Sequence, residues 1–293
     1  SAIGGDHSVY HKDEGAAIRR TSHALLTDRS DEASDAHTLT DLYAHLHRES
    51  VDATMYAHVG GRYADIAYAH DPALESAVEV HSSWGTFEWI VEDAFRKGYR
   101  VGIVANSDGH KGRPGACYPG ASFFGSMGGL TCYLTPELSR PAIFEAMHGR
   151  RHYGTTGARI FLDTAATFDA PVATWRQDPA AGGSACGEAK AVPMGAIVES
   201  GSDTVTFRAD ISATAPIDTI ELRDGPVVLE TIRPHRVEGP SRRLRVVYEG
   251  AATRGRSRAV AWQGAISVEG NRIERSAILN NWNLDRGIRD EGP

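Results

Sequence analysis

Cysteine is scarce in this chain. Cys117, Cys132 and Cys186 are the only three among 293 residues, and no CxxC pair is present. An odd number of thiols cannot all pair internally, and their spacing gives no sign of a thiolate zinc site. The cysteines therefore predict neither a disulfide framework nor a compartment.

Long apolar segments are also missing. No run of about 18 apolar residues occurs, so the sequence predicts no membrane-spanning helix. The chain opens Ser1-Ala2-Ile3 without a charged-then-apolar leader, so no signal peptide is visible. Because no initiator Met is present either, a processed or truncated start stays open. We expect a soluble protein and predict no localisation beyond that.

A surplus of basic residues is the third absence. The chain has 31 Lys and Arg against 38 Asp and Glu, which gives a formal net charge of −7. This balance argues against a nucleic-acid partner. Hydrophobic residues make up 41% and charged residues 24%, as in ordinary globular proteins, so disorder is excluded as the main state. A chain of 293 residues suits two domains.

Histidine, by contrast, is concentrated in the first part of the chain. Ten of the 13 histidines lie within the first 110 residues: His7, His11, His23, His37, His45, His47, His58, His70, His81 and His110. Imidazole is a common metal ligand and acid–base group near neutral pH. Crowding alone does not distinguish metal ligands from surface histidines, so the position of each histidine in the predicted fold has to indicate which of them are ligands.

The first part of the chain alternates strand and helix patterns. Helix starts are predicted at Thr38, where Asp41 completes a capping box, at Thr86 and at Ser139, and Gly98 should end the second helix. Apolar runs predict strands over 54–59, 77–80, 101–105, 130–134 and 152–156. This alternation favours an α/β fold with a parallel sheet.

The second part reads as β structure. Short strands are predicted over 204–211, 219–222, 227–232, 244–248 and 259–268, and the Gly/Ala-rich stretch 178–191 is expected to be a loop or insertion. Such strands are typical of a small antiparallel β-sandwich. We therefore expect two domains, one covering 1–160 and a β-sandwich covering 161–293.

Four potential metal ligands fall at the ends of predicted strands. His58, His81, Asp108 and His110 would share one edge, because chemistry in parallel α/β folds gathers at the carboxyl ends of strands. Nitrogen and oxygen ligands without thiolate suit Zn, Mn or Fe. The competing interpretation is that backbone carbonyls bind these imidazoles.

Several motifs around these residues resemble one known superfamily. The stretches His58-Val-Gly-Gly, Glu79-Val-His81-Ser-Ser-Trp-Gly and Ala105-Asn-Ser-Asp-Gly-His110-Lys-Gly-Arg-Pro-Gly115 look like the later metal motifs of the polymerase and histidinol phosphatase (PHP) superfamily. The runs Gly128-Gly-Leu-Thr and Arg151-His-Tyr-Gly-Thr-Thr-Gly157 are similar to an uncharacterised subfamily of it. The resemblance covers roughly residues 1–160.

The resemblance implies a distorted (β/α)7 barrel with up to three divalent metal ions and cleavage of phosphate esters. It also implies that His58 and His81 share one metal, that Asp108 binds a second and that His110 binds a third. The expected fold class is thus α/β, part of such a barrel followed by the β-sandwich.

The chain departs from this pattern at its start. The superfamily opens with a His-x-His pair and continues to a bridging Glu, whereas His45-Leu-His47 has the spacing but lies on a predicted helix. We therefore expect the first barrel strands to lie upstream of Ser1, leaving a partial barrel that binds metal weakly. If the barrel is instead closed, His7, His11, His45 or His47 would supply the missing ligands.

The expected function is a metal-dependent hydrolase of phosphate esters in which metal-activated water attacks. Asp108 and His110 would be its catalytic residues, and Lys111 and Arg113 would bind a small anionic substrate, unless they make only surface contacts. Two alternatives stay open: a non-catalytic binding or interaction protein that keeps part of a metal barrel, and an amide or lactone hydrolase. The oligomeric state is not predicted.

Overall fold

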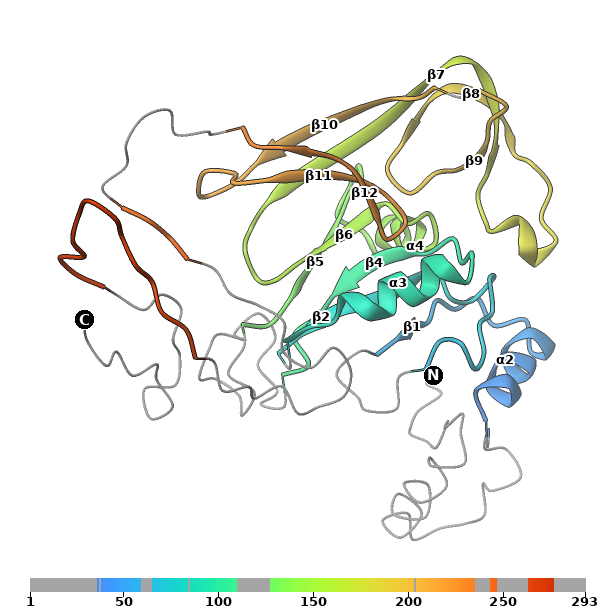
Figure 1. Cartoon of the computed structure of the whole chain (residues 1–293). Helices are drawn as coiled ribbons and strands as arrows, with labels where there is room; N and C mark the ends of the chain where they lie inside the picture. Colours follow the sequence, from blue (N-terminus) through green and yellow to red (C-terminus); the bar gives the residue numbers. More distant parts are fainter. Residues whose placement is uncertain are drawn as a thin grey trace, which may run out of the picture.

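The computed structural model places a small, mainly parallel sheet with its helices beneath a group of antiparallel strands (Figure 1). The residues that it describes are 36, 38–58, 65–83, 85–109, 127–202, 204–234, 243–246 and 263–276. No helix within this part of the chain has the length and apolar character needed to cross a membrane.

Two helices begin where their capping residues predict. α2 (Leu39–Arg48) starts after Thr38, whose hydroxyl accepts the Asp41 N–H at 3.1 Å while the Asp41 carboxylate accepts the Thr38 N–H at 3.0 Å. This reciprocal pair is the predicted capping box. α4 (Arg140–His148) starts after Ser139, whose hydroxyl accepts a backbone N–H of the first turn. Both predicted starts are confirmed.

The remaining helix begins at Glu88 rather than at the predicted Thr86, and it ends just before the predicted glycine. α3 (Glu88–Arg96) is followed by Gly98, whose φ of 75° lies in the left-handed region. The Gly98 N–H donates to the Phe95 carbonyl at 2.9 Å, and the Tyr99 N–H donates to the Ala94 carbonyl at 3.0 Å. These two bonds form a Schellman motif, which satisfies carbonyls that the helix itself leaves without donors.

The first sheet is built around a central strand, β2 (Ala77–Ser82). Both β1 (Tyr56–Ala57) and β4 (Gly102–Ala105) pair with β2 in parallel, and β3 (Gly85–Thr86) pairs with its end in the antiparallel sense. α3 packs on this sheet with its apolar face, so that a cluster of buried side chains forms the local core: Ile66, Val78, Phe87, Ile90 and Ala94.

The next two strands form a separate antiparallel pair. β5 (Leu130–Tyr133) pairs with β6 (His152–Thr155), and α4 connects them. β5 starts at the carboxyl end of β4, because the Gly129 N–H donates to the Asn106 carbonyl at 2.9 Å. β5 therefore begins at the end of the sheet where β4 finishes, whereas a parallel neighbour of β4 would begin at the opposite end.

The prediction of an α/β fold with part of a (β/α)7 barrel is wrong. The described residues form several small sheets, strands outnumber helices, and β5 and β6 are antiparallel. A parallel strand needs a crossover connection of a dozen or more residues, usually a helix. The Gly-rich stretch between β4 and β5 has no helix pattern in the sequence, which argues against a parallel β4–β5 pair.

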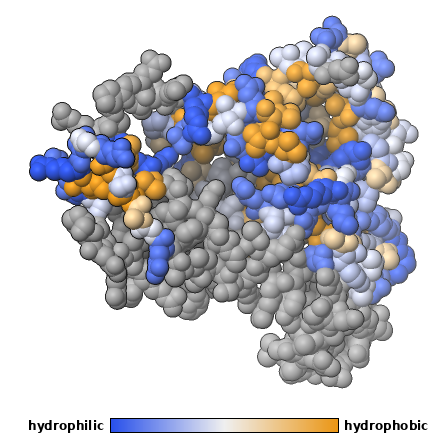
Figure 2. Space-filling view, in the orientation of Figure 1, coloured by the Kyte–Doolittle hydropathy of each residue, from blue (hydrophilic) through white to orange (hydrophobic). Residues whose placement is uncertain are grey.

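The second part of the chain is antiparallel, but its described strands do not form the predicted β-sandwich. The long strand β7 (Phe161–Trp175) pairs with β8 (Gly187–Pro193), β9 (Ile197–Glu199) and β10 (Thr206–Ser212). A separate hairpin joins β11 (Ile220–Asp224) to β12 (Val227–Ile232). Every residue of β12 is exposed, and its apolar side chains gather on the surface shown in Figure 2. A sandwich strand would instead alternate between buried and exposed side chains.

Some predicted strands are also corrected in detail. The stretch 178–191, expected to be a loop or insertion, contains a 3-10 turn (Pro179–Ala181) and the first part of β8. The described parts of the predicted strands 244–248 and 259–268 are not strands. The strand predicted over 227–232 is confirmed as β12. The turn that precedes it contains Gly225, whose φ of 55° lies in the left-handed region.

We predict that Gly154→Ala lowers the free energy of unfolding by about 1–3 kcal/mol, the usual effect of overpacking. A Cβ at this position in β6 would lie 2.8 Å from the Ala105 Cβ and 3.0 Å from the Ala105 nitrogen, so the backbone itself would have to move. Gly183→Ala is the matched control, since no atom lies within 4 Å of its added Cβ. Urea unfolding of both variants measures the difference, and equal values would contradict the prediction.

His152 should make the protein less stable in mild acid. The side chain is buried in β6, its Nδ1 lies 3.1 Å from the Ile103 carbonyl, and burial, with a smaller effect of the Arg150 charge, lowers its pKa below the ordinary value of 6.5. Below that pH the unfolded chain takes up a proton that the folded imidazole resists, so the free energy of unfolding falls as the pH decreases.

The test compares wild type with His152→Gln by urea unfolding at neutral pH and near pH 5. The wild type should lose more stability than the variant over this range, so the gap between them should narrow in acid. His45→Gln serves as the control histidine on α2. A gap that stays constant or widens in acid would mean that His152 is not the group responsible.

Candidate functional site

The carboxyl ends of the parallel strands bring two predicted ligands together. His58 directly follows β1, and Asp108 lies three residues after β4. In the structure the His58 Nε2 and the Asp108 Oδ2 are 3.4 Å apart. The structure thus places these two residues side by side, at the sheet edge that the strand-end argument indicates.

Glu79 belongs to the same site, although the sequence analysis did not assign it a role. Its Oε2 lies 2.6 Å from the Nδ1 of His58, and its Oε1 accepts the Asn106 side-chain N–H at 2.9 Å. The Glu79 side chain is only 6% exposed, whereas that of His58 is 51% exposed. A buried carboxylate needs such donors to offset the loss of water. The carboxylate therefore fixes the imidazole with Nδ1 inward and Nε2 toward Asp108.

The loop that carries Asp108 is tied to the end of β2. The Ser83 N–H donates to the Ser107 carbonyl at 3.0 Å, and the Ser83 hydroxyl donates to the Asp108 carbonyl at 3.3 Å. Asp108 itself has a φ of 47°, in the left-handed region that Asp tolerates better than most residues. These bonds hold the loop in a conformation that aims the Asp108 carboxylate at His58.

His81 is buried in the same strand as Glu79, but both of its ring nitrogens have protein partners. Nε2 donates to the Met127 carbonyl at 2.8 Å, and Nδ1 lies 2.8 Å from the Thr86 hydroxyl. A carbonyl can only accept, so Nε2 carries a proton, and in the neutral ring Nδ1 accepts from Thr86. A metal ion would have to displace one of these partners. The metal-ligand role of His81 therefore stays a prediction.

Close packing surrounds this imidazole. A Cβ on Gly129 would lie 2.9 Å from the His81 Cδ2 and 2.8 Å from the Ala105 Cβ. Next to it, the Thr131 hydroxyl donates to the Ala105 carbonyl at 2.8 Å and accepts the Ala105 N–H at 3.0 Å. The start of β5 is thus fixed directly against the end of β4, where the candidate ligands lie.

Other predicted site residues are placed elsewhere or are not described. His110, Lys111 and Arg113 lie outside the described residues, as do His7 and His11.

The two histidines of α2, His45 and His47, are among the described residues, and no hydrogen bond or ion pair within this part of the chain joins either of them to His58 or Asp108. The His47 Nε2 is 2.6 Å from a carboxylate oxygen of Asp71, which fastens α2 to the following loop. Among the residues that the structure describes, no group of three or more His, Cys, Asp or Glu side chains is placed to hold a metal ion.

One comparison with known proteins gives a match. Residues 119–222 are similar to a protein family of unknown function, DUF3604. This segment includes β5, α4, β6 and all of β7 to β10, but not His58, Glu79 or Asp108. No curated protein and no solved structure matches the chain.

Proposed function

We propose that the chain is a metal-dependent hydrolase whose centre includes His58 and Asp108, with phosphate esters as its substrates. The observation that carries this proposal is the directed imidazole: the buried Glu79 carboxylate holds Nδ1 of His58 at 2.6 Å, and Nε2 lies 3.4 Å from Asp108. Imidazole ligands of metal ions commonly have their second nitrogen bound to a carboxylate in this way.

The donor set suits a divalent ion. One imidazole nitrogen and one carboxylate oxygen are ligands that Zn, Mn and Fe accept. Two ligands of a tetrahedral zinc ion with ordinary bond lengths are about 3.4 Å apart. The observed separation of Nε2 and Oδ2 has this value. The resemblance to the PHP superfamily supplies His81 and His110 as the further ligands of the proposal, and it carries the choice of phosphate esters.

The residues of the proposed site then each have a defined role in ester hydrolysis. A divalent ion bound here would activate water for attack and stabilise developing negative charge. Glu79 keeps the His58 proton on Nδ1, and Asp108 offers its carboxylate from a loop held by Ser83. Lys111 and Arg113 would bind the anionic group of a small substrate. The overall reaction consumes one water and releases an alcohol and phosphate.

A second candidate function is binding without catalysis. It is favoured by one observation: the described residues offer a pair of ligands rather than a group of three or more. Hydrolysis of an amide or a lactone is a variant of the first proposal, because the same activated water attacks carbonyl carbon. Metal content and turnover together separate these possibilities.

We predict that Asp108→Asn and His58→Gln each lower zinc or manganese affinity roughly tenfold or more, because each removes one ligand. The full chain is loaded with zinc or manganese, its metal content is measured by elemental analysis, and turnover is followed with p-nitrophenyl phosphate. His45→Gln, on α2, is the matched control and should bind and turn over as the wild type does.

The outcomes distinguish the three functions. Loss of both metal and turnover in the two ligand variants supports the phosphoesterase. Bound metal without turnover of p-nitrophenyl phosphate supports amide or lactone hydrolysis if a nitroanilide or a lactone is cleaved, and the binding protein if neither is. Unchanged metal content in Asp108→Asn contradicts the site.

The role of Glu79 can be tested separately. Glu79→Gln should weaken metal affinity about 10- to 100-fold, the usual effect of losing the partner of a metal-bound imidazole. Glu75→Gln is a matched control, since Glu75 is also buried and also lies within 2.8 Å of a histidine Nδ1, that of His70. Both variants lose a buried charge and should be similarly destabilised. If both lose metal equally, Glu79 has only a structural role.

A further inference from the structure

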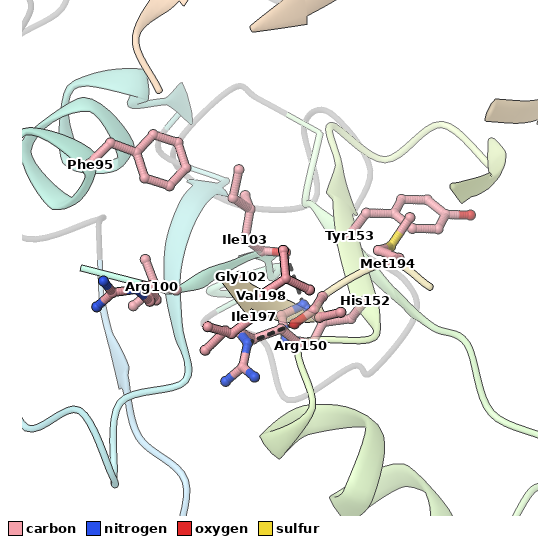
Figure 3. Close-up of a pocket in the computed structure, with 13 residues that line it drawn as sticks. Phe95, Arg100, Gly102, Ile103, Arg150, His152, Tyr153, Met194, Ile197 and Val198 are labelled. Atoms are coloured by element: carbon pink, nitrogen blue, oxygen red, sulfur yellow. Dashed lines mark hydrogen bonds between the residues drawn. The ribbon is translucent and has the colours of Figure 1, made fainter. Parts of the chain in front are cut away.

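A cavity lies where the two parts of the chain meet. It has a volume of about 490 Å³ and shares no lining residue with the His58–Asp108 site. Its walls come from the end of α3, from β4 and β6, and from the turn between β8 and β9 (Figure 3). Most of the wall is apolar, formed by Phe95, Val101, Ile103, Met194, Ile197 and Val198. Pockets of this size and position commonly bind small molecules.

One buried cation lines this apolar cavity. Arg150, only 7% exposed, donates from Nε to the Gly195 carbonyl at 2.9 Å, from Nη1 to the His148 carbonyl at 3.1 Å and from Nη2 to the Arg176 carbonyl at 2.8 Å. A guanidinium has more N–H donors than these three bonds use. One hydrogen on Nη1 and one on Nη2 are therefore left for another acceptor.

The positive charge of Arg150 is not neutralised by contact. Carbonyls satisfy N–H groups but bring no negative charge, and within the described ranges no carboxylate forms an ion pair with Arg150. Asp178 acts on it only from a distance, because its carboxylate binds Arg100 at 3.0 Å. Burial accordingly lowers the pKa of Arg150, and Asp178 opposes this only in part.

The other polar residues of the wall add no charge to the cavity. Figure 3 shows the side chain of Arg100 turned away from the group formed by Ile103, Arg150, His152 and Ile197. His152 donates to the Ile103 carbonyl, and burial lowers its pKa, so it is neutral near pH 7. The cavity thus combines one uncompensated positive charge with an apolar wall.

We propose that this cavity binds a small carboxylate with an apolar tail. The carboxylate would accept from the remaining N–H groups of Arg150 in charge-assisted hydrogen bonds. The tail would lie on the wall formed by Ile103, Ile197 and Val198. Binding joins the two parts of the chain, because Arg150 and Ile103 belong to the first and Ile197 and Val198 to the second.

Octanoate is the probe, with octanol and octylamine as uncharged and cationic molecules of the same length. Calorimetric titration of the full chain should show octanoate binding roughly tenfold tighter than octanol, since a charge-assisted hydrogen bond is much stronger than a neutral one. Octylamine should bind more weakly still. Equal affinity for all three probes overturns the proposal.

Two variants locate the binding. Arg150→Met should remove the preference for octanoate over octanol, while Arg140→Met, an exposed arginine on α4, should leave it unchanged. Ile103→Trp fills the cavity without touching the carbonyl bonds of Arg150, and it should abolish binding of octanoate and octanol alike. Circular dichroism and thermal unfolding confirm that each variant folds. Octanoate binding that survives Ile103→Trp overturns the proposal whatever Arg150→Met does.

Discussion

The space around Ala105 is the constraint on which the arrangement of the first part depends. Ala105, the last residue of β4, is fully buried, and a Cβ on either Gly129 or Gly154 would lie 2.8 Å from its own Cβ. Gly129, just before β5, and Gly154, in β6, can approach Ala105 this closely only because glycine has no Cβ. The hydroxyl of Thr131 completes the contact by bonding both backbone groups of Ala105.

This close approach contributes to the positions of Asp108 and His81. Asp108 follows Ala105 by three residues, so its loop starts from the most tightly packed point of the sheet. The same contact places Gly129 against the His81 ring and so lets the Met127 carbonyl accept from its Nε2. Packing at one alanine therefore sets the start of the Asp108 loop and fixes the orientation of the His81 imidazole on the neighbouring strand β2.

Local features of the fold could be predicted from the sequence, and pairing direction could not. The capping box of Thr38 and Asp41 and the glycine stop at Gly98 involve residues a few positions apart, so their patterns are visible in the chain. The direction of β5 depends on the bonds of Gly129 and Thr131 to the end of β4, more than twenty residues earlier in the sequence. No periodicity shows such a contact, so the alternating strand–helix pattern predicts a parallel sheet, and the resemblance extends this expectation to a barrel.

The site shows the same division. The strand-end argument predicts that His58 and Asp108 share one sheet edge, because strand ends can be identified from apolar runs, and the two side chains do lie close together. It missed Glu79, because β2 is buried along almost its whole length and shows no alternation to mark an inward carboxylate. The available signal was the charge itself, since a lone carboxylate within a buried strand requires a donor nearby. The partners of His81 could not be predicted for a related reason: Thr86 lies in the short strand β3, which folds back on β2.

Two of the buried charged residues, Glu79 and Arg150, differ in how they are satisfied, and this difference separates their roles. Glu79 is bound by an imidazole that can itself carry a positive charge, so the pair can be neutral without any added group. Arg150 is bound only by carbonyls, which leave its charge in place. An internal ion pair suits a residue that positions a neighbour, whereas a buried charge without a counterion favours an anion from outside. The cavity at the beginning of β4 and the ligand pair beyond its end are thus chemically distinct sites on one strand.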